Sequence, residues 1–508
     1  MVTTRRTSQN TKIILLLFFY FLTIIGNAQV GIGTTTPNTS SVLDISSTTH
    51  GMLAPRMTTA QRNAIVTPAD ALLVYDTDVK SFYYYNATTA SWTILSGGTP
   101  TRANFKRIKA GDNLAVVLAT ELAAGGGSKY VLTSNTLYEI NGQVVFNLPI
   151  DLNNAYLDGL DANEDIIVKT SGVLFDGTTG GSIRNLTITT PGATVFNLNA
   201  AASTSTFLLR DTIIANSNSI GTISGYGLVF LSIVNFSGNT NGITYNNIGQ
   251  LLLSNQAWFS NNAGTYEKFT GTFNLIEKQG GFSNVASGAF GVDVSTAGLT
   301  ITGDAVLESV VFTGPTPANY VKPYPASSTT YTGYNFNNSW TVRAAGIPTE
   351  ADAYAVGDFA IDYPVNNVGV NVPLNNSTPS NVVKVGISTG TAPTTIYSNL
   401  FRFTTDATSA GYNRLIYAGK KKRIFQITGA ISIQVPGAGI FLAYVTKNGT
   451  PLTQYKNYGR SVVNGDIINL PLQATAELNT GDYIEVAVQR NSGATGTVSV
   501  PTLSLTIK

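Results

Sequence analysis

The sequence predicts an all-β protein with a parallel β-helix in the middle, an antiparallel jelly-roll sandwich at the C-terminus and a small α+β module at the N-terminus. Charged residues make up only 11% of the 508 residues, whereas Gly, Thr, Ser and Asn are abundant, a composition typical of turn-rich β structure. Similar apolar runs begin 22 to 26 residues apart between residues 183 and 259. Short strand-like runs separated by Gly-containing turns fill residues 397–508.

Residues 1–28 have the pattern of a cleavable secretory signal. Three bases and no acid precede an apolar run from Ile13 to Ile25, and small residues end the segment at Ala28. A membrane anchor is the alternative, but the run is shorter than the roughly 20 residues that span a bilayer. We therefore expect cleavage near Ala28 and a protein secreted or displayed at the cell surface or outer membrane, with no transmembrane segment after cleavage.

The charge balance and the absence of cysteine exclude several classes of function. The chain has 30 Lys and Arg against 28 Asp and Glu, and removal of the predicted signal leaves 27 bases against 28 acids. This balance favours no nucleic-acid partner. With no cysteine, disulfides, thiolate metal sites and a lipid-modified N-terminal cysteine are excluded.

Residues 29–98 form a first module with the runs QVGIGTTTPNTSSVLDI, GMLAPRMTTAQRNAI and ALLVYDTDVKSFYYYNATTASWTIL. They predict one short helix, capped by Thr58 or Thr59, followed by three strands. The expected elements are a helix at Met57–Ile65 and strands at Leu72–Tyr75, at Phe82–Tyr85 and around Trp92 and Ile94. This order resembles an N-terminal module common on exported proteins of gliding bacteria with an outer membrane, and the resemblance implies an extracellular appendage.

Residues 99–320 are expected to form the β-helix, with a capping helix before its first coil. Asp112 is a candidate N-cap for a helix from Asn113 to Ala124, which three glycines would end. Similar strand-forming runs then recur at spacings within the range of stacked solenoid units. The runs are IRNLTI (Ile183–Ile188), LRDTII (Leu209–Ile214), LSIVNF (Leu231–Phe236), LSNQAWF (Leu253–Phe259) and LESVVF (Leu307–Phe312).

Aligning these runs predicts an inner ladder of stacked aliphatic side chains. Its members are Ile183, Leu209, Leu231 and Leu253. The pattern resembles a right-handed parallel β-helix of the pectate-lyase or phage-tailspike type, in which a helix covers the open apolar end and its unpaired strand edges. An antiparallel β-sandwich with coincidental spacing is the alternative, and the repeat weakens after Phe259.

Residues 321–396, rich in Pro, Asn, Ser and Thr, are expected to hold capping strands and a connector, and residues 397–508 a jelly roll. Asn448-Gly449 between alternating runs predicts a two-residue hairpin turn. The runs RIFQITG, YVTKNG, LNTGDYIEVAV and LSLTI resemble the TNF/C1q-like jelly roll at the tips of phage fibres and on bacterial surface proteins. The resemblance implies a homo-oligomer, a trimer held through this C-terminal domain, that binds a surface glycan or protein.

No catalytic residue, cofactor site or metal site is assigned from the sequence. The only histidine is His50, and with no cysteine there is no nucleophile–base pair or histidine-rich metal set. A polysaccharide lyase or hydrolase on the β-helix would need cations or paired carboxyls. The best cluster in the aligned coils places Arg184 beside Arg210 and Asn185 beside Asp211. An ordinary turn-supporting ladder is the competing interpretation of that cluster.

Three further clusters each have a functional and a structural interpretation. The acidic run Asp158–Asp165 could hold Ca²⁺, although it lacks EF-hand spacing, or form a solvated turn. The basic run Lys420–Arg423 could meet an anionic glycan or protect a strand edge. The aromatic run Phe82–Tyr85 with Trp92 could stack on sugars or pack within its own module.

The combined expectation is a non-enzymatic extracellular or cell-surface protein, structural or adhesive, with a β-helix stalk and a C-terminal binding head. One alternative is a polysaccharide lyase or glycoside hydrolase acting on the β-helix. Another is a phage-derived fibre or tailspike-like protein. The export signal argues against this last alternative, because virion proteins assemble in the cytoplasm.

Overall fold

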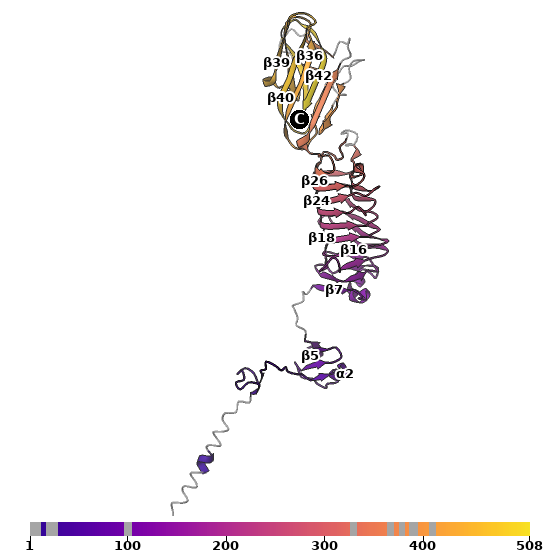
Figure 1. Cartoon of the computed structure of the whole chain (residues 1–508), viewed down its shortest axis with the longest axis vertical. Helices are drawn as coiled ribbons and strands as arrows, with labels where there is room; N and C mark the ends of the chain where they lie inside the picture. Colours follow the sequence, from indigo (N-terminus) through magenta and orange to yellow (C-terminus); the bar gives the residue numbers. More distant parts are fainter. Residues whose placement is uncertain are drawn as a thin grey trace, which may run out of the picture. The chain divides into compact units, whose positions relative to one another are not determined.

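The computed structural model describes residues 12–16, 29–95, 104–325, 333–362, 370–374, 382–385, 395–405 and 413–508. It divides into two compact units, residues 1–102 and residues 103–508, which are described one after the other (Figure 1). Within the predicted signal, Lys12–Leu16 is helical, and the other residues of 1–28 lie outside the described part. In the described ranges, no helix has the length and apolarity needed to cross a bilayer.

The first unit contains a parallel strand pair and a four-stranded sheet with one helix. The pair is β1 (Val30–Ile32) with β2 (Leu43–Ile45); the sheet has the order β3 (Arg56–Met57), β4 (Leu73–Asp76), β5 (Ser81–Asn86), β6 (Ser91–Ile94); and α2 spans Thr59–Asn63. The predicted helix and three strands are confirmed, with small differences at their ends. Thr58 is the N-cap: its hydroxyl accepts from the Gln61 amide at 3.2 Å, and the Gln61 side chain accepts from the Thr58 amide at 2.9 Å.

The second unit begins as a parallel β-solenoid whose strands stack from coil to coil (Figure 1). A 13-stranded sheet contains β7 (Phe105–Lys109), β9 (Leu137–Asn141), β10 (Gln143–Val145), β12 (Tyr156–Asp158), β13 (Ile166–Val168), β15 (Gly181–Arg184), β16 (Thr187–Thr189), β18 (Thr206–Ala215), β20 (Leu228–Ser237), β22 (Gln250–Trp258), β24 (Thr272–Asn284), β26 (Thr300–Thr313) and β28 (Trp340–Ala345). A 9-stranded sheet contains β8 (Tyr130–Val131), β11 (Ile150–Asp151), β14 (Gly172–Gly177), β17 (Ala193–Asn199), β19 (Ser219–Ser224), β21 (Ile243–Asn246), β23 (Thr265–Thr270), β25 (Phe290–Asp293) and β27 (Val321–Lys322). Neighbouring strands pair in parallel, which excludes the antiparallel alternative for this region.

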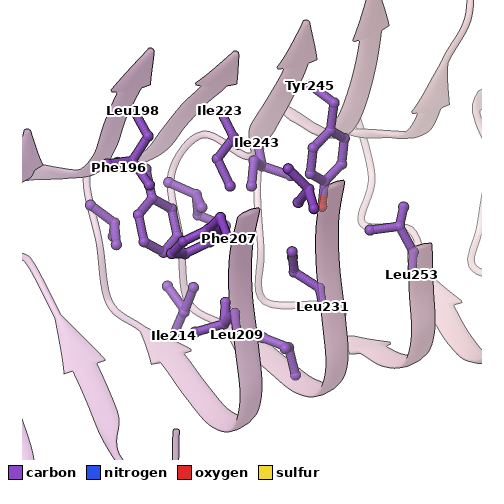
Figure 2. Close-up of a cluster of buried hydrophobic side chains, with 14 of the residues drawn as sticks. Phe196, Leu198, Phe207, Leu209, Ile214, Ile223, Leu231, Ile243, Tyr245 and Leu253 are labelled. Carbon is purple, nitrogen blue, oxygen red and sulfur yellow. The ribbon is translucent and has the colours of Figure 1, made fainter. Parts of the chain in front are cut away.

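The predicted inner ladder is confirmed residue by residue. Ile183 pairs in register with Leu209, Leu209 with Leu231, and Leu231 with Leu253. All four side chains are buried, and they share the solenoid interior with residues of the other sheet such as Phe196 (Figure 2). Because each inward position repeats in the next coil, one apolar column extends through the solenoid.

The run at Leu307–Phe312 also lies in this register, but it does not directly follow the coil of Leu253. One further coil lies between the coils of Leu253 and Leu307. Its residue Lys278 pairs with Leu253 on one side and with Leu307 on the other. This coil is absent from the predicted set of runs, because Lys278 and Ser283 occupy positions that are aliphatic or aromatic in the coils on either side. The weakening of the repeat after Phe259 is therefore a change of residue type within a continuing solenoid.

A column of left-handed residues marks the corner that follows each strand of this ladder. Positive φ angles occur at in-register residues of successive coils: Asn185 (55°), Asp211 (49°), Ile233 (55°), Asn255 (50°), Gly280 (69°) and Ser309 (58°). Asn, Asp and Gly tolerate this conformation, whereas a β-branched residue such as Ile233 is strained in it. The predicted stacking of Asn185 with Asp211 is confirmed, and the backbone geometry of the corner explains it.

Two short helices cover the first coil in place of the single helix predicted at Asn113–Ala124. They are α3 (Leu114–Val117) and α4 (Ala119–Ala124). Leu118 between them has φ −107° and ψ 32°, outside the helical region. Its side chain is fully buried with the solenoid core, so the helices still cover the apolar end.

The prediction of Asp112 as the helix cap is wrong. The Asn113 side chain accepts from the Ala115 amide at 3.2 Å and is the N-cap of α3. Asp112 instead accepts from the Lys109 amide at 2.7 Å. Lys109 ends β7, a strand that lies before the helices and pairs with β9, so the carboxyl of Asp112 closes a turn of the first coil.

The second unit ends in a sandwich of two antiparallel sheets of seven strands each. One sheet contains β29 (Val356–Asp362), β30 (Val370–Leu374), β32 (Thr395–Ile396), β33 (Leu400–Phe401), β36 (Arg423–Gln434), β40 (Ile467–Leu478) and β42 (Gly496–Ile507). The other contains β31 (Val382–Lys384), β34 (Phe403–Thr405), β35 (Leu415–Tyr417), β37 (Gly439–Lys447), β38 (Thr450–Pro451), β39 (Asn457–Ser461) and β41 (Tyr483–Gly493). The predicted hairpin at Asn448-Gly449 is confirmed: Lys447 pairs with Thr450, and both turn residues have positive φ, 50° and 77°.

Candidate functional site

The outward face of the 13-stranded sheet carries a column of charged and polar side chains, one from each coil. In register these are Arg107, Glu139, Asp158, Arg184, Arg210, Ser232, Ser254, Gln279, Glu308 and Arg343. The predicted cluster of Arg184 and Arg210 belongs to this column. Beyond Arg210 the column stays polar but uncharged at Ser232, Ser254 and Gln279, and charges return at Glu308.

The charges near Arg184 are already paired with one another. Arg184 donates from Nε and Nη2 to Oδ2 of Asp158, at 2.9 and 2.7 Å, and Asn185 donates to Oδ1 of the same carboxylate at 3.0 Å. One coil further back, Arg107 pairs with Glu139 at 2.6 Å. Glycoside hydrolysis needs one carboxyl as acid and another as base or nucleophile. These carboxylates are instead occupied by arginine, so the contacts favour the structural ladder.

Arg210 is the least engaged cation of the cluster. Its Nη2 lies 3.6 Å from the carboxylate of Asp211, and both side chains are more than a third exposed. Beside it is a shallow hollow of about 220 Å³, lined by Asn135, Asn154, Tyr156, Gly181, Ser182, Thr206 and Leu208. Tyr156 is 47% exposed there. An exposed aromatic ring beside amides and hydroxyls is a surface on which a sugar can stack.

The acidic run Asp158–Asp165 forms a turn held by its own hydrogen bonds. Asp165 accepts from the amides of Gly142 (2.8 Å), Leu160 (2.6 Å) and Asp161 (3.0 Å). Burial raises the pKa of Asp165, but these hydrogen bonds outweigh it and hold that pKa below the usual value. Among the described residues no group of three or more acidic or histidine side chains could hold a metal ion. The geometry therefore favours the turn over the Ca²⁺ site.

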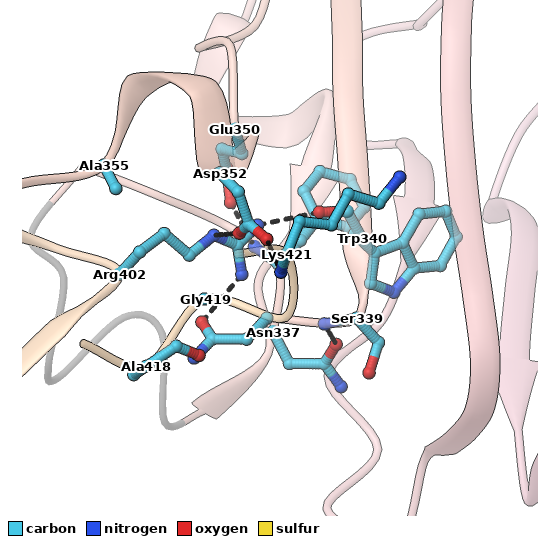
Figure 3. Close-up of polar contacts among 12 residues, drawn as sticks. Asn337, Ser339, Trp340, Glu350, Asp352, Ala355, Arg402, Ala418, Gly419 and Lys421 are labelled. Carbon is cyan, nitrogen blue, oxygen red and sulfur yellow. Dashed lines mark hydrogen bonds and ion pairs between the residues drawn. The ribbon is translucent and has the colours of Figure 1, made fainter. Parts of the chain in front are cut away.

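The basic run Lys420–Arg423 lies where the sandwich contacts the end of the solenoid (Figure 3). Lys420 Nζ donates to the Gly303 carbonyl at 2.7 Å, the Lys421 amide donates to Asp352 at 2.8 Å, and Arg423 donates to the Asp352 carbonyl at 2.8 Å. The fourth residue, Lys422, lies 3.2 Å from Glu477 and is mostly exposed. Most of this cluster is therefore used to join the two parts of the second unit.

A fully buried arginine, Arg402, is the centre of this junction (Figure 3). Its Nη1 donates to Asn338 and its Nη2 to the Trp340 carbonyl, both at 2.7 Å, and Nε lies 3.5 Å from Asp352. Arg402 has a φ of 60°, a conformation that costs a non-glycine residue energy and is kept where the surroundings demand it. No pattern in the sequence marked this residue.

Glu350 is a second buried charge at the junction. Its two carboxylate oxygens accept from the backbone amides of Asn335, at 2.6 Å, and Phe336, at 2.9 Å. Burial raises the pKa of Glu350 to about 7, although these hydrogen bonds and the charge of Arg402 act in the opposite direction. The stability of the junction is therefore expected to depend on pH.

A third polar cluster, missed by sequence reasoning, lies inside the solenoid. Lys278 Nζ lies 2.8 Å from Oε2 of Glu267 and donates to Oε1 of Gln256 at 2.8 Å. The available signal was a pair of charges inside the run EKFTGTFNLIEK, at positions that are apolar in neighbouring coils.

The aromatic run of the first unit mostly packs within it. Arg62 lies 3.9 Å above the Tyr83 ring, and the rings of Tyr85 and Trp92 are 5.5 Å apart. Phe82, on the other face of the strand, contacts Tyr75 with ring centroids 5.1 Å apart. Alternate side chains thus point to opposite faces of the strand, and the contacts favour packing within the module. His50 is an exposed turn residue whose ring lies 2.8 Å from the neighbouring Thr49 hydroxyl.

Residues 31–107 match the family model described as phage tail like trimerisation region. No curated protein matches the chain. Similar solved structures include the enzymatically active domain of tailspike protein 4 of bacteriophage CBA120, with 8% identity, 90% of this chain and 77% of that chain covered, and a TM-score of 0.27. Another is the tailspike protein of Acinetobacter baumannii phage AM24, with 8% identity, coverage of 87% and 91%, and a TM-score of 0.19.

The family match bears on two of the sequence predictions. The matched family is described as a trimerisation region and covers residues 31–107, whereas the sequence resemblance placed the trimer contacts in the C-terminal domain. The family match also supports the phage-fibre alternative, against which the predicted export signal had argued. Trimerisation through the C-terminal domain stays a prediction.

Proposed function

We propose that this chain is the subunit of a homotrimeric, exported fibre of the phage-tail type. In this proposal the N-terminal unit holds three copies together, the solenoid is a rigid spacer, and the C-terminal sandwich binds a surface glycan or protein without catalysis. The observation that carries the proposal is the match of residues 31–107 to a phage tail like trimerisation region. Three linked heads would raise the avidity of weak contacts.

Exposed apolar side chains in the first unit support self-association there. In the β1–β2 pair, Val30 lies beside Leu43 and Ile32 beside Ile45, so all four side chains share one face. They are 40–54% exposed. A two-stranded sheet is marginally stable by itself, and a contiguous exposed apolar face marks an interaction site. A second copy of the same unit is the occupant that the family match favours.

The strand order supports a jelly-roll head. The sheets contain the paths β29-β42-β36-β40 and β35-β41-β37-β39, so strands far apart in the chain lie next to one another in each sheet. Double sheets of this kind are typical of jelly rolls in capsid and lectin domains. This similarity, with the sequence resemblance at the same residues, favours binding over chemistry for the head.

The mass of the chain lacking residues 1–28, measured by light scattering, tests the trimer. We expect three times the mass of one chain for the unsubstituted protein. Ile32→Asp with Ile45→Asp should reduce it to one chain, because carboxylates would replace the apolar contact. Val116→Asp changes a still more exposed apolar residue in the second unit and should leave the trimer intact. A monomeric unsubstituted protein would overturn the proposal.

Two further measurements test the other parts of the proposal. If the chain is exported as expected, the N-terminal peptide of the secreted protein, identified by mass spectrometry, begins at Gln29; a chain found only inside the cells with residues 1–28 retained would refute export. The full trimer on a glycan array should bind without altering the glycan.

The enzymatic alternative rests on the hollow at Tyr156 beside Arg210. If the protein releases unsaturated or reducing sugar ends, and the double variant Arg210→Ala with Asp211→Ala does not, then the chain is a lyase or hydrolase and the proposal of binding without catalysis is wrong. Tyr156→Ala should weaken any glycan binding in this hollow and leave binding by the head unchanged.

A further inference from the structure

Two adjacent coils of the solenoid carry a polar triad, with Gln256 and Glu267 in one coil and Lys278 in the next, at inward positions whose in-register neighbours are apolar or glycine. The in-register neighbours are Leu253 and Leu307 for Lys278, Ile243 and Val292 for Glu267, and Gly281 for Gln256. The exposed fractions of the three side chains are 2%, 0% and 1%. Burying charged groups in an apolar interior is costly. A buried ion pair that also contacts a buried amide therefore needs an explanation.

The Glu267 carboxylate lacks the backbone hydrogen bonds that hold other buried carboxylates of this chain. Apart from the ion pair with Lys278, the carboxylate oxygens of Glu267 accept no hydrogen bond within the described part of the chain. Asp165, by contrast, accepts three backbone amides. Burial raises the pKa of Glu267, although the Lys278 charge opposes this shift. The carboxylate is thus well placed to take up a proton from the ammonium group beside it.

The amine lies within reach of the amide carbon of Gln256. Nζ of Lys278 is 2.8 Å from Oε1, the oxygen bonded to Cδ. Gly281 pairs in register with Gln256 and allows the next coil to approach closely, because a Cβ at Gly281 would lie 2.1 Å from the Gln256 carbonyl oxygen. Reactive groups held in contact, with water excluded, react as though highly concentrated.

We propose that Lys278 and Gln256 join in an intramolecular isopeptide bond, with Glu267 as the group that moves the proton. Glu267 takes a proton from the Lys278 ammonium, and the neutral amine attacks Cδ of Gln256. A proton from the attacking nitrogen passes to Nε2, the Cδ–Nε2 bond breaks, and ammonia leaves. The products are a secondary amide, one ammonia molecule and a protonated Glu267, so atoms and charge balance without any other reactant.

The reaction removes two charges from the apolar interior. An ammonium and a carboxylate become a neutral amide and a neutral carboxylic acid, and the free-energy cost of burying these neutral groups is smaller. The new bond links β22 to β24 through the core of the solenoid. In a chain without cysteine, such a bond would supply the covalent cross-link that disulfides give other exported proteins.

Tryptic mapping of the purified full chain tests the bond. Trypsin cleaves after Lys and Arg except before Pro, so it would release fragments 211–268, 269–278 and 279–343, because Pro323 follows Lys322. With Lys278 acylated we expect no cleavage after it, and instead one species joining 211–268 to 269–343, lighter than the sum of its parts by one ammonia. Fragmentation must place the link at Gln256. Intact mass alone is insufficient, because an N-terminal Gln29 can also lose ammonia on cyclisation.

Matched variants separate the bond from folding. Lys278→Leu and Gln256→Val introduce residue types that this core already buries, so each should fold and lack the link. Glu267→Gln keeps shape and should lose most of the link, whereas the exposed Gln279→Ser should retain it. Full recovery of free 269–278 from the unsubstituted protein would overturn the proposal. A link to Glu267 with loss of water would also overturn it.

Discussion

The solenoid and the sandwich bury their apolar residues in different ways. In the solenoid, Leu231 pairs with Leu209 and Leu253, each from an adjacent coil. In the sandwich, β29 pairs with β42 and joins Gly357 to Ile507. The first arrangement is a sum of nearest-neighbour contacts, and the second depends on long-range pairing. Damage is therefore expected to stay local in the solenoid and to spread through the sandwich.

The largest expected effect lies where the two regions meet. Arg402→Met would leave the Asp352 carboxylate and the Trp340 carbonyl without their buried partner. Breaking one side of a buried charged contact typically costs about 3–5 kcal/mol. Urea unfolding should show a loss of this size and a separation of the solenoid and sandwich transitions. The exposed Arg460→Met on β39 is the control, and equal unfolding curves for both variants would contradict the role of Arg402.

Cavities in the two cores should lower the unfolding free energy by similar amounts but loosen regions of different size. Leu231→Ala and Ile431→Ala each truncate a fully buried aliphatic side chain, one per region, and each should cost about 2–5 kcal/mol. Hydrogen exchange distinguishes the two responses. Protection should fall only in the coils next to Leu231, but across most of the sandwich for Ile431→Ala. Equal spreading in both regions would refute the nearest-neighbour description of the solenoid.

The same contrast explains what the sequence could predict. The ladder at Ile183 and Leu231 was predictable because the same inward residue type returns at each coil. The strands of the sandwich were predictable from alternation and turns such as Asn448-Gly449, but their partners were not. Pairing of β29 with β42 joins segments at opposite ends of the domain, and no local pattern encodes it.

The residues that were not predicted share one property: their roles depend on contacts that no local sequence pattern reveals. Arg402 bonds to Asn338 and the Trp340 carbonyl across two parts of the chain, so its role depends on tertiary contacts. Lys278 breaks the apolar repeat, which concealed its coil from a comparison based on apolar residues. Asp112 and Asn113 are both good capping residues, and only the turn back to Lys109 decides between them.

Glu350 should make the junction sensitive to pH. Its pKa in the folded protein is about 7, above the value of 4.5 for an unperturbed glutamate, so its stabilising contribution is complete below pH 4.5 and is lost as the pH rises through 7. The difference corresponds to about 3 kcal/mol. The unfolding free energy of the unsubstituted protein should fall between pH 4.5 and 7, and Glu350→Gln should lack the part of this fall that Glu350 contributes. The exposed Glu477→Gln should keep it, and a slope unchanged in Glu350→Gln would be evidence against this assignment.

A smaller effect of opposite sign is expected at the solenoid corner. Ile233 has a φ of 55° and a side chain that is 51% exposed, so it bears backbone strain with little compensating burial. Ile233→Asn, the residue found at the same corner in Asn185 and Asn255, should stabilise the solenoid by about 1 kcal/mol. Val311→Asn, at an exposed strand position of β26, should not stabilise it. Destabilisation by Ile233→Asn would mean that the exposed isoleucine makes a contact worth more than the strain.

The smallest effects are expected in the outward charged column, and they compare two arginines in adjacent coils. Arg184 makes two hydrogen bonds to Asp158, whereas the one acidic partner of Arg210 within the described ranges is Asp211, at 3.6 Å. Ion pairs exposed to solvent contribute about 0–1 kcal/mol. Arg184→Gln should therefore lower the unfolding free energy by up to about 1 kcal/mol, and Arg210→Gln should leave it unchanged.

Salt separates an ion pair from a packing contribution at Arg184. The Debye length falls to about 3 Å at 1 M salt, so the cost of Arg184→Gln should shrink there if the charge carries it. A cost that persists in 1 M salt would mean that the arginine stem packs on the sheet. A measurable loss of unfolding free energy in Arg210→Gln would mean that Arg210 makes a stabilising contact in addition to its 3.6 Å ion pair with Asp211. Since only a cation without a strong internal partner is free to meet an anionic ligand, the stability of Arg210→Gln also decides whether Arg210 is available for binding in the hollow beside Tyr156.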